Sequence, residues 1–188
     1  MAAWRARARA ALALGYPVAI YCALLWFEPR VVAAALVVLL LMRQRVYAQR
    51  YLSELSWVSR GILAALVLLC LLALALNDER LVRLYPAALS AAFLLVFGLS
   101  LYYPPTVVER IARLRTPDLP DAGVRYTRQV TRIWCAFFAV NALIAAWTAL
   151  WATREVWALY NGFFAYLAMG ALFAGEWILR RRRFPEAR

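Results

Sequence analysis

The residues best suited to chemistry in this chain are arginines, and three of them recur at helical spacing. Arg125, Arg128 and Arg132 occupy positions i, i+3 and i+7 of a stretch that runs without a break into apolar sequence. At about 100° per residue, their guanidinium groups would share one face of a single helix. Guanidinium binds phosphate and carboxylate bidentately, so the spacing predicts an anion-binding surface. We expect this face to continue deeper along the helix in Trp134, Phe137, Phe138 and Asn141.

This arginine surface has two interpretations. A basic rim beside a membrane often serves as an anchor that attracts anionic headgroups without a shaped site. The alternative is a site shaped for one phosphate or carboxylate, such as the prosthetic group of an acyl carrier or a lipid phosphate. Arg110 and Arg113 would extend either surface, on a short helix that Thr106 can cap.

Polar residues inside the apolar runs are the second group of candidates. Asn141 lies nine residues beyond Arg132, roughly 13 Å deeper, which places an amide near mid-bilayer depth. Asn161 lies near the other end of its run, so the two amides could bond each other or a facing carbonyl, although their depths differ. Glu176 precedes Arg180 by four residues and could form a local ion pair, or it could face a cavity with an arginine of another helix. Tyr126 is the fourth polar candidate of this kind.

Composition places these candidates in a membrane. The chain is 66% hydrophobic with a mean hydropathy of +0.66, which is typical of an all-α integral membrane protein. We expect one transmembrane domain over residues 1–188, built as a bundle of six transmembrane helices. The predicted spans are residues 11–27, 31–47, 61–76, 81–103, 133–152 and 156–179.

Three segments of this plan need separate interpretation. The first apolar run is long for a signal peptide and lacks a clear cleavage site, so we expect it to be retained as a helix. Residues 31–42 give only twelve uninterrupted apolar residues, so the second helix either continues past Arg43 with snorkelling side chains or forms a re-entrant arm. Residues 46–59 suggest a short amphipathic interfacial helix, or a plain connector. A helical cytoplasmic loop is expected between spans four and five, because Pro104 and Pro105 must end the fourth span.

The arginines are distributed unevenly between the two ends of the predicted spans. With both termini in the cytoplasm, 18 of the 22 basic residues lie inside, and Arg30, Arg80, Arg83 and Arg154 lie outside. The positive-inside rule favours this orientation. We therefore expect a multi-pass protein of the bacterial inner membrane. Tryptophans and tyrosines would form an aromatic belt at the outer surface, at positions 147, 151, 157 and 160.

Several reaction classes lack their residues. The chain has no histidine or lysine, which removes imidazole bases, lysine Schiff bases and histidine metal ligands. The cysteines Cys22, Cys70 and Cys135 lie far apart within apolar runs, and glycine-rich phosphate loops are missing. No metal, cofactor or catalytic residue is predicted, and an enzymatic activity is unsupported.

Three stretches of the second half resemble a known family. They are FGLSLYYPPTVVERIARL at 97–114, RYTRQVTRIWCAFFAVNALIAAWTAL at 125–150 and WALYNGFFAYLAMGALFAGEWILRRRRF at 157–184. They are similar to an uncharacterised family of bacterial inner-membrane proteins that accompany aryl-polyene-type gene clusters. The resemblance implies a role in placing polyunsaturated acyl chains in the cell envelope, but it carries no catalytic residues over. WCAFFAVN is also similar to a motif of the intracellular septation protein family.

Two classes of function follow, with a third held in reserve. We expect a non-catalytic accessory or scaffold protein that serves a lipid or aryl-polyene-type envelope pathway. Its partners would be membrane lipids with anionic headgroups, and acyl-carrier or lipid-pathway membrane enzymes, without nucleic acid. The alternative is a small carrier or flippase for an amphipathic anion. A small membrane transferase would require a buried acid and an arginine that converge on an enclosed polar pocket.

Overall fold

Helices make up all the regular structure in the part of the chain that the computed structural model describes. That part comprises residues 23, 26–47, 56–114 and 116–183, with the backbone alone for residues 30, 40–47 and 56–60. The expected all-α class is therefore confirmed there, while nearly all of the predicted first span, 11–27, lies outside the described residues. The elements are α2 (Pro29–Tyr47), α3 (Ser56–Leu76), α4 (Glu79–Arg83), α5 (Tyr85–Tyr102), α6 (Val107–Arg113), α7 (Asp121–Trp151), α8 (Arg154–Leu159), the π-helical turn η1 (Tyr160–Phe164) and α9 (Ala165–Arg183).

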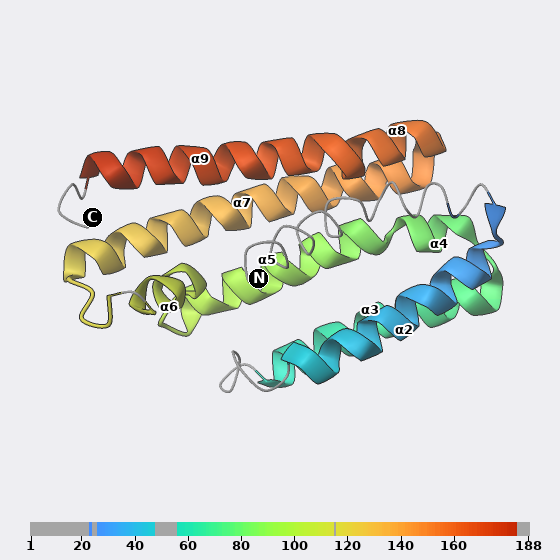
Figure 1. Ribbon diagram of the computed structural model, residues 1–188, viewed down its shortest axis with the longest axis horizontal. Helices are drawn as coiled ribbons and strands as arrows, with labels where there is room; N and C mark the ends of the chain where they lie inside the picture. The colour runs from blue at the N-terminus through green and yellow to red at the C-terminus, as the bar shows by residue number, and fades with distance from the viewer. Residues whose placement is uncertain (1–22, 24–25, 48–55, 115, 184–188) are drawn as a thin grey trace, which may run out of the picture.

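The long helices lie side by side and alternate in direction. Helix α7 packs along α5, and the continuous run of α8, η1 and α9 returns on the other side of α7 (Figure 1). Helices α2 and α3 form a hairpin that packs against α4 and the start of α5, and its other end diverges from the bundle (Figure 1). This arrangement brings α6, the start of α7 and the end of α9 to one end of the molecule.

Local sequence explains where the helices begin and end. Asn77 has a φ of 49° directly after α3, and asparagine tolerates this left-handed conformation better than most residues. Asp78 then caps α4 by accepting a hydrogen bond from the Arg80 N–H at 2.8 Å. Thr106 and Glu109 form a reciprocal capping box at the start of α6, which confirms the helix predicted in this loop.

Prolines divide and end the fourth predicted span. Helix α4 ends at Arg83, and α5 begins at Tyr85 with Pro86 in its first turn, so the predicted single helix is two helices joined at Leu84. Proline lacks the N–H that would continue the first helix. Pro104 and Pro105 follow the last residue of α5 and confirm the predicted end of this span.

Three helical segments among the described residues are long and apolar enough to cross a membrane. They are Glu79–Tyr102, Asp121–Trp151 and Arg154–Arg183, while Gly61–Leu76 is a shorter apolar helix. Helix α7 has 31 residues and is therefore about 46 Å long, well beyond the about 30 Å of a hydrocarbon core. Its basic first third and its apolar remainder form one unbroken helix, as predicted. The separate interfacial helix predicted at 46–59 is not supported at its edges, since residues 46–47 belong to α2 and 56–59 to α3.

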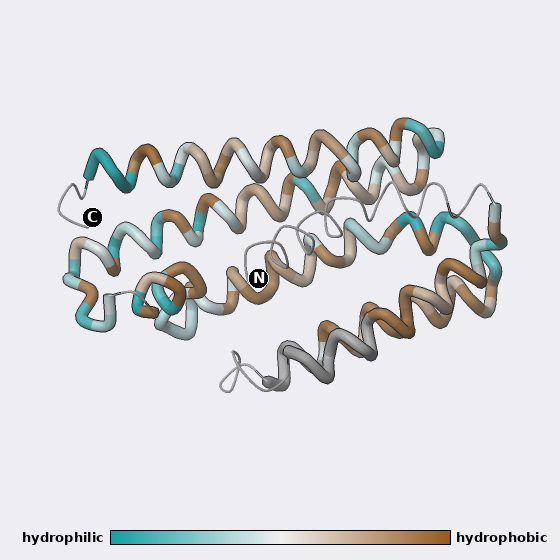
Figure 2. Tube along the Cα trace, in the orientation of Figure 1, coloured by the Kyte–Doolittle hydropathy of each residue, from teal (hydrophilic) through white to brown (hydrophobic). Residues whose placement is uncertain are grey.

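The helices bury few of their hydrophobic side chains against one another and leave broad apolar faces exposed. Hydrophobic residues lie along the middle of the helices, and hydrophilic residues gather near the ends of α9, α6, α8 and α4 (Figure 2). Leu143 is 72% exposed, Leu167 is 58% exposed, and Ala165 is the one buried residue of α9. Exposed apolar surface of this extent is typical of helices surrounded by lipid. One buried core joins α2, α3, α4, the start of α5, α7 and α8, and a second, aromatic core joins α5, α7 and α9.

Candidate functional site

The predicted arginine surface is present at the start of α7. Arg125, Arg128 and Arg132 are all exposed, and they share one side of the helix because of their spacing. Arg128 donates from Nη2 to the Leu101 carbonyl oxygen at the long distance of 3.4 Å. None of the three forms an ion pair with a residue that the structure describes. Their positive charges therefore lack an internal counter-ion within this part of the chain.

The predicted continuation of this surface into an aromatic wall is wrong. Trp134, Phe138 and Asn141 are 7%, 6% and 8% exposed, and they lie on the opposite side of α7 from the arginines. At about 100° per residue, the nine positions from Arg125 to Trp134 amount to about two and a half turns, which places Trp134 on the opposite side. The aromatic residues pack against α5 and α9, with Phe138 stacked on Phe93 at a centroid distance of 5.1 Å. The arginine surface and the aromatic core are thus separate features.

Arg110 and Arg113 have partners within the loop that carries them. Arg113 pairs with Glu109 at 2.9 Å, and it also donates to the Pro117 carbonyl oxygen at 2.9 Å. Arg110 donates from Nε to the Pro105 carbonyl oxygen at 3.0 Å. These contacts fix α6 within the loop between α5 and α7. The two arginines therefore contribute to the structure of the loop in addition to the positive charge at this end.

Glu176 forms the local ion pair that its spacing predicts. Its Oε1 atom lies 3.2 Å from Nε of Arg180, one turn further along α9. The Tyr126 hydroxyl donates to the Glu176 carbonyl oxygen at 3.3 Å and lies 3.4 Å from Oε1. Arg183 also lies near the Tyr126 ring, at 5.9 Å from its centroid. Tyr126 and Glu176 thus join the start of α7 to the end of α9.

Asn141 connects three helices near the middle of the bundle. Its Nδ2 atom donates to Ser90 Oγ of α5 at 2.8 Å, and its Oδ1 atom accepts from the Tyr160 hydroxyl of η1 at 2.9 Å. The amide is therefore bonded on both sides, which removes most of the cost of placing it at this depth. Asn161 does not pair with it. It donates instead to Thr148 Oγ1 and to the Trp157 carbonyl oxygen, at 3.3 and 2.9 Å.

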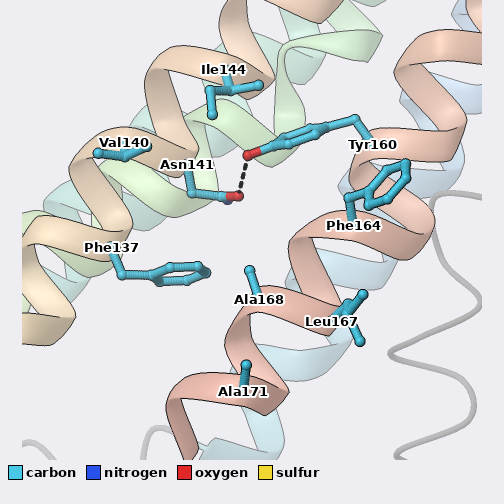
Figure 3. A pocket seen from close by; sticks show the side chains of 9 residues that line it. All are labelled: Phe137, Val140, Asn141, Ile144, Tyr160, Phe164, Leu167, Ala168 and Ala171. Atoms are coloured by element: carbon cyan, nitrogen blue, oxygen red, sulfur yellow. Dashed lines mark hydrogen bonds between the residues drawn. The ribbon is translucent and has the colours of Figure 1, made fainter.

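A pocket lies beside the bond between Asn141 and Tyr160. It has a volume of about 400 Å³ and lies between α7 on one side and η1 and α9 on the other (Figure 3). Its walls are apolar apart from Asn141 and Tyr160, whose side chains meet at one end of it (Figure 3). The lining residues are Phe137, Val140, Asn141, Ile144, Tyr160, Phe164, Leu167, Ala168 and Ala171.

Arg83 is the polar residue whose surroundings the sequence analysis missed. It was expected at the outer surface, yet it is 7% exposed and lies between α4, α7 and α8. Its Nη2 atom donates to the carbonyl oxygens of Thr148, Ala152 and Thr153, while its own carbonyl accepts from Trp157 Nε1 at 2.9 Å. The apolar neighbours Leu81, Val82, Leu84 and Tyr85 could have indicated burial, because an arginine within an apolar run usually has a specific partner.

The aromatic belt prediction is wrong for two of its four residues, Trp157 and Tyr160. Trp147 and Trp151 are 55% and 71% exposed, but Trp157 is 1% exposed, and the Tyr160 hydroxyl is bonded to Asn141 inside the bundle. Glu79 completes this end of the molecule by accepting hydrogen bonds from Nε and Nη2 of Arg154, the first at 2.8 Å. Glu79 also lies 3.8 Å from Arg83. An acid and two arginines therefore meet here, but they bond one another and backbone carbonyls.

Two buried polar atoms near Thr148, Arg83 Nε and Asn161 Oδ1, have no hydrogen-bond partner among the residues that the structure describes. The orientation of the Asn161 amide follows from its bond to the Trp157 carbonyl, which requires the NH₂ group on that side. Its Oδ1 atom therefore needs a donor.

Among the described residues, no group of three metal-ligating side chains lies together.

Comparisons with protein-family models, curated proteins and solved structures found no match to this chain. Functional conclusions therefore rest on its own residues and their geometry.

Proposed function

We propose that this chain is a non-catalytic accessory or scaffold protein of the bacterial inner membrane. It serves a lipid or aryl-polyene-type envelope pathway, and it holds an anionic lipid, an acyl intermediate or a partner enzyme at its arginine-rich end. The observation that carries this proposal is the exposed trio Arg125, Arg128 and Arg132, which has no carboxylate partner among the described residues. An external anion is the natural counter-ion for such a surface.

The proposed orientation has six spans and both termini in the cytoplasm. Three membrane-length helices and one shorter apolar helix support a multi-pass arrangement. Support for the orientation comes from the distribution of arginine, because α6, the start of α7 and the basic end of α9 lie at one end of the bundle (Figure 1). On the cytoplasmic side, these charges would lie beside anionic headgroups, which attract each near-surface arginine by about 1 kcal/mol.

The geometry of α7 suggests how the surface meets the membrane. A helix of 31 residues exceeds the roughly 20 that cross the hydrocarbon core, so about ten remain in the headgroup layer or beyond it. Arg125, Arg128 and Arg132 all lie within its first twelve residues. They project from an unbroken helix and not from a loop, so the span itself fixes their height and direction.

A carrier for an amphipathic anion is the second candidate, and the apolar pocket beside Asn141 is the observation that favours it. The scaffold is preferred because no arginine lines that pocket, so an anion bound there would lack a positive partner. A transferase has less support. The acid and arginines that it requires are found at Glu79, Arg83 and Arg154, where they are bonded to one another and to the helix backbone.

The test is a triple substitution of Arg125, Arg128 and Arg132 by glutamine. Native mass spectrometry of the purified protein would count bound phosphatidylglycerol and phosphatidylethanolamine, and mass spectrometry would identify co-purifying proteins. We expect the triple variant to lose most of its preference for the anionic lipid, together with any acyl-carrier or lipid-pathway partner. Two single substitutions, Arg128→Gln and Arg80→Gln, serve as a matched comparison. Each removes one exposed arginine, and the two arginines lie at opposite ends of the bundle. Unchanged phosphatidylglycerol binding by the triple variant would refute the proposal.

A further inference from the structure

The pocket between α7 and the run of η1 and α9 lies between two of the contacts that join these segments. At one end the Tyr160 hydroxyl donates to Asn141 at 2.9 Å. At the other end the rings of Trp134 and Phe173 meet at a centroid distance of 4.6 Å. Between these contacts α9 presents Ala168 and Ala171, whose methyl groups leave the space towards α7 open (Figure 3).

The π-helical turn η1 shapes the same end of the pocket. The Ala165 N–H donates to the Tyr160 carbonyl, five residues back, in place of the usual spacing of four. Tyr160 and Phe164, the first and last residues of this turn, both line the pocket. Single π-helical turns are rare and occur frequently at functional sites. This second observation is independent of the volume of the pocket and points to the same place.

The lining indicates which chemistry the pocket accepts. Seven of its nine residues are alanine, valine, leucine, isoleucine or phenylalanine, and none is charged. The two polar residues, Asn141 and Tyr160, bond each other, and Asn141 also bonds Ser90. An anion, a metal ion or a water cluster would therefore gain little here. An apolar ligand would bury its surface without leaving either polar group unpaired.

The position of the pocket indicates where such a ligand comes from. Val140, Phe164 and Leu167 line the pocket and remain 56%, 48% and 58% exposed, so they form an open apolar rim. They belong to segments long and apolar enough to cross a membrane. At the depth of Asn141, the medium beside this rim is the hydrocarbon of the bilayer. A lipid chain can therefore enter sideways without crossing water.

We propose that this pocket is a binding site for one acyl chain of a bilayer phospholipid. The chain enters between Val140 and Leu167, lies over Ala168 and Ala171, and ends against the bonded pair Asn141 and Tyr160. The volume of about 400 Å³ falls within the about 300 to 1,000 Å³ that small-molecule sites usually have. This site goes beyond the scaffold function and does not depend on it, because the arginine surface lies on another side of α7.

The test uses the full chain in bilayer nanodiscs that contain a trace of phospholipid with a photoreactive diazirine in its acyl chain. After irradiation, mass spectrometry maps the labelled residues. We expect label at Phe164, Leu167 and Ala168 to exceed several-fold the label at Leu143, which is more exposed but lies outside the pocket. Equal labelling of the two regions means annular lipid only and overturns the proposal. Label at Leu143 without any label in the pocket means that something other than a lipid chain occupies the pocket. This result overturns the proposal as well.

A pair of variants checks that the pocket itself holds the chain. Ala168→Phe fills the space and should reduce the pocket label several-fold, whereas Ala174→Phe makes the same change at an exposed position of α9 outside the lining. If Ala168→Phe does not fold, Ala171→Leu fills part of the same space with a smaller group and should show a smaller loss. Pocket labelling that stays at the level of the wild type in the folded filling variant would refute the site. The filling variants keep all three arginines, so the preference for phosphatidylglycerol at the arginine surface should stay unchanged. The two proposals therefore fail separately.

Discussion

The Nη2 atom of Arg83 lies 2.7 Å from the carbonyl oxygen of Thr148, a residue 65 positions later in the chain. The same nitrogen lies 2.6 Å from the Ala152 carbonyl oxygen and 3.2 Å from that of Thr153. The last carbonyl groups of a helix have no partner within the helix, and they carry its partial negative charge. A guanidinium group from α4 therefore caps the end of α7.

Replacing Arg83 should destabilise the bundle far more than replacing a neighbouring arginine. Arg83→Met keeps a side chain of similar length but removes the donor to the Ala152 carbonyl oxygen. The Thr148 and Thr153 carbonyl oxygens lose one of two donors, because they also accept from the Ala152 and Trp157 N–H groups. We expect the free energy of unfolding to fall by at least about 1 to 3 kcal/mol, the cost of an unsatisfied buried polar group. Arg80→Met removes the same charge from an exposed position three residues away and should have little effect. Unfolding of both variants in detergent would measure the difference, and equal stabilities would contradict the capping role.

The contrast between these two arginines shows what the sequence could predict and what it could not. Hydropathy and charge can be read along the chain, so they place α7 and the last residues of α5 with good accuracy. They also place Arg80 and Arg83 at the same end of a span. They do not show which neighbouring helix each side chain faces, because that depends on the packing of α4 against α7. The position of Thr148 next to Arg83 is a property of that packing alone.

The hydrogen bond between Asn141 and Ser90 should couple α7 to α5 measurably. In a double-mutant cycle of Asn141→Val and Ser90→Ala, we expect an interaction energy of about 0.6 kcal/mol, with about 1.7 kcal/mol as the upper range for membrane proteins. Ser100→Ala is the control, because Ser100 is buried in α5 but bonds Phe97 and Val107 and not Asn141. The control pair should be additive. Additive energies for Asn141 with Ser90 as well would mean that the bond contributes nothing to stability.

For Asn141, helical periodicity predicts the depth correctly, but the helix face was assigned wrongly. Its depth follows from counting residues along one helix, and a polar partner was expected because an unpaired amide is costly there. Its face does not follow from its order in the sequence. The same 100° per residue that groups the three arginines places Trp134 and Asn141 about half a turn from Arg125. Ser90 and Tyr160 come from other helices, so the sequence alone could not identify them.

Labelling from outside the cell should separate the two ends of the bundle. We consider single cysteines at Glu155 and at Asp118, both exposed, in a variant with Cys22, Cys70 and Cys135 replaced. The distribution of arginine predicts that the first position faces the periplasm and the second the cytoplasm. A membrane-impermeant maleimide should therefore label the Glu155→Cys variant in intact cells, and the Asp118→Cys variant only after permeabilisation. Labelling of the latter in intact cells would invert the proposed orientation.

The last prediction concerns whether the arginine surface recognises shape or charge alone. Substituting lysine for Arg125, Arg128 and Arg132 keeps every positive charge but removes the planar fork that binds phosphate bidentately. All three side chains are exposed, and none of them lines the pocket. We therefore expect the triple-lysine protein to insert in the same orientation and to keep most of its phosphatidylglycerol.

Two outcomes of that experiment are informative at matched abundance. If the lysine variant retains lipid that the triple-glutamine variant loses, the surface acts through its charge, and binding should weaken as salt rises because the charges are exposed to solvent. If the lysine variant loses the lipid as fully as the glutamine variant does, the guanidinium geometry is required. In that case the arginines form a specific phosphate site, because a general attraction to anionic headgroups would have survived the exchange of one cation for another.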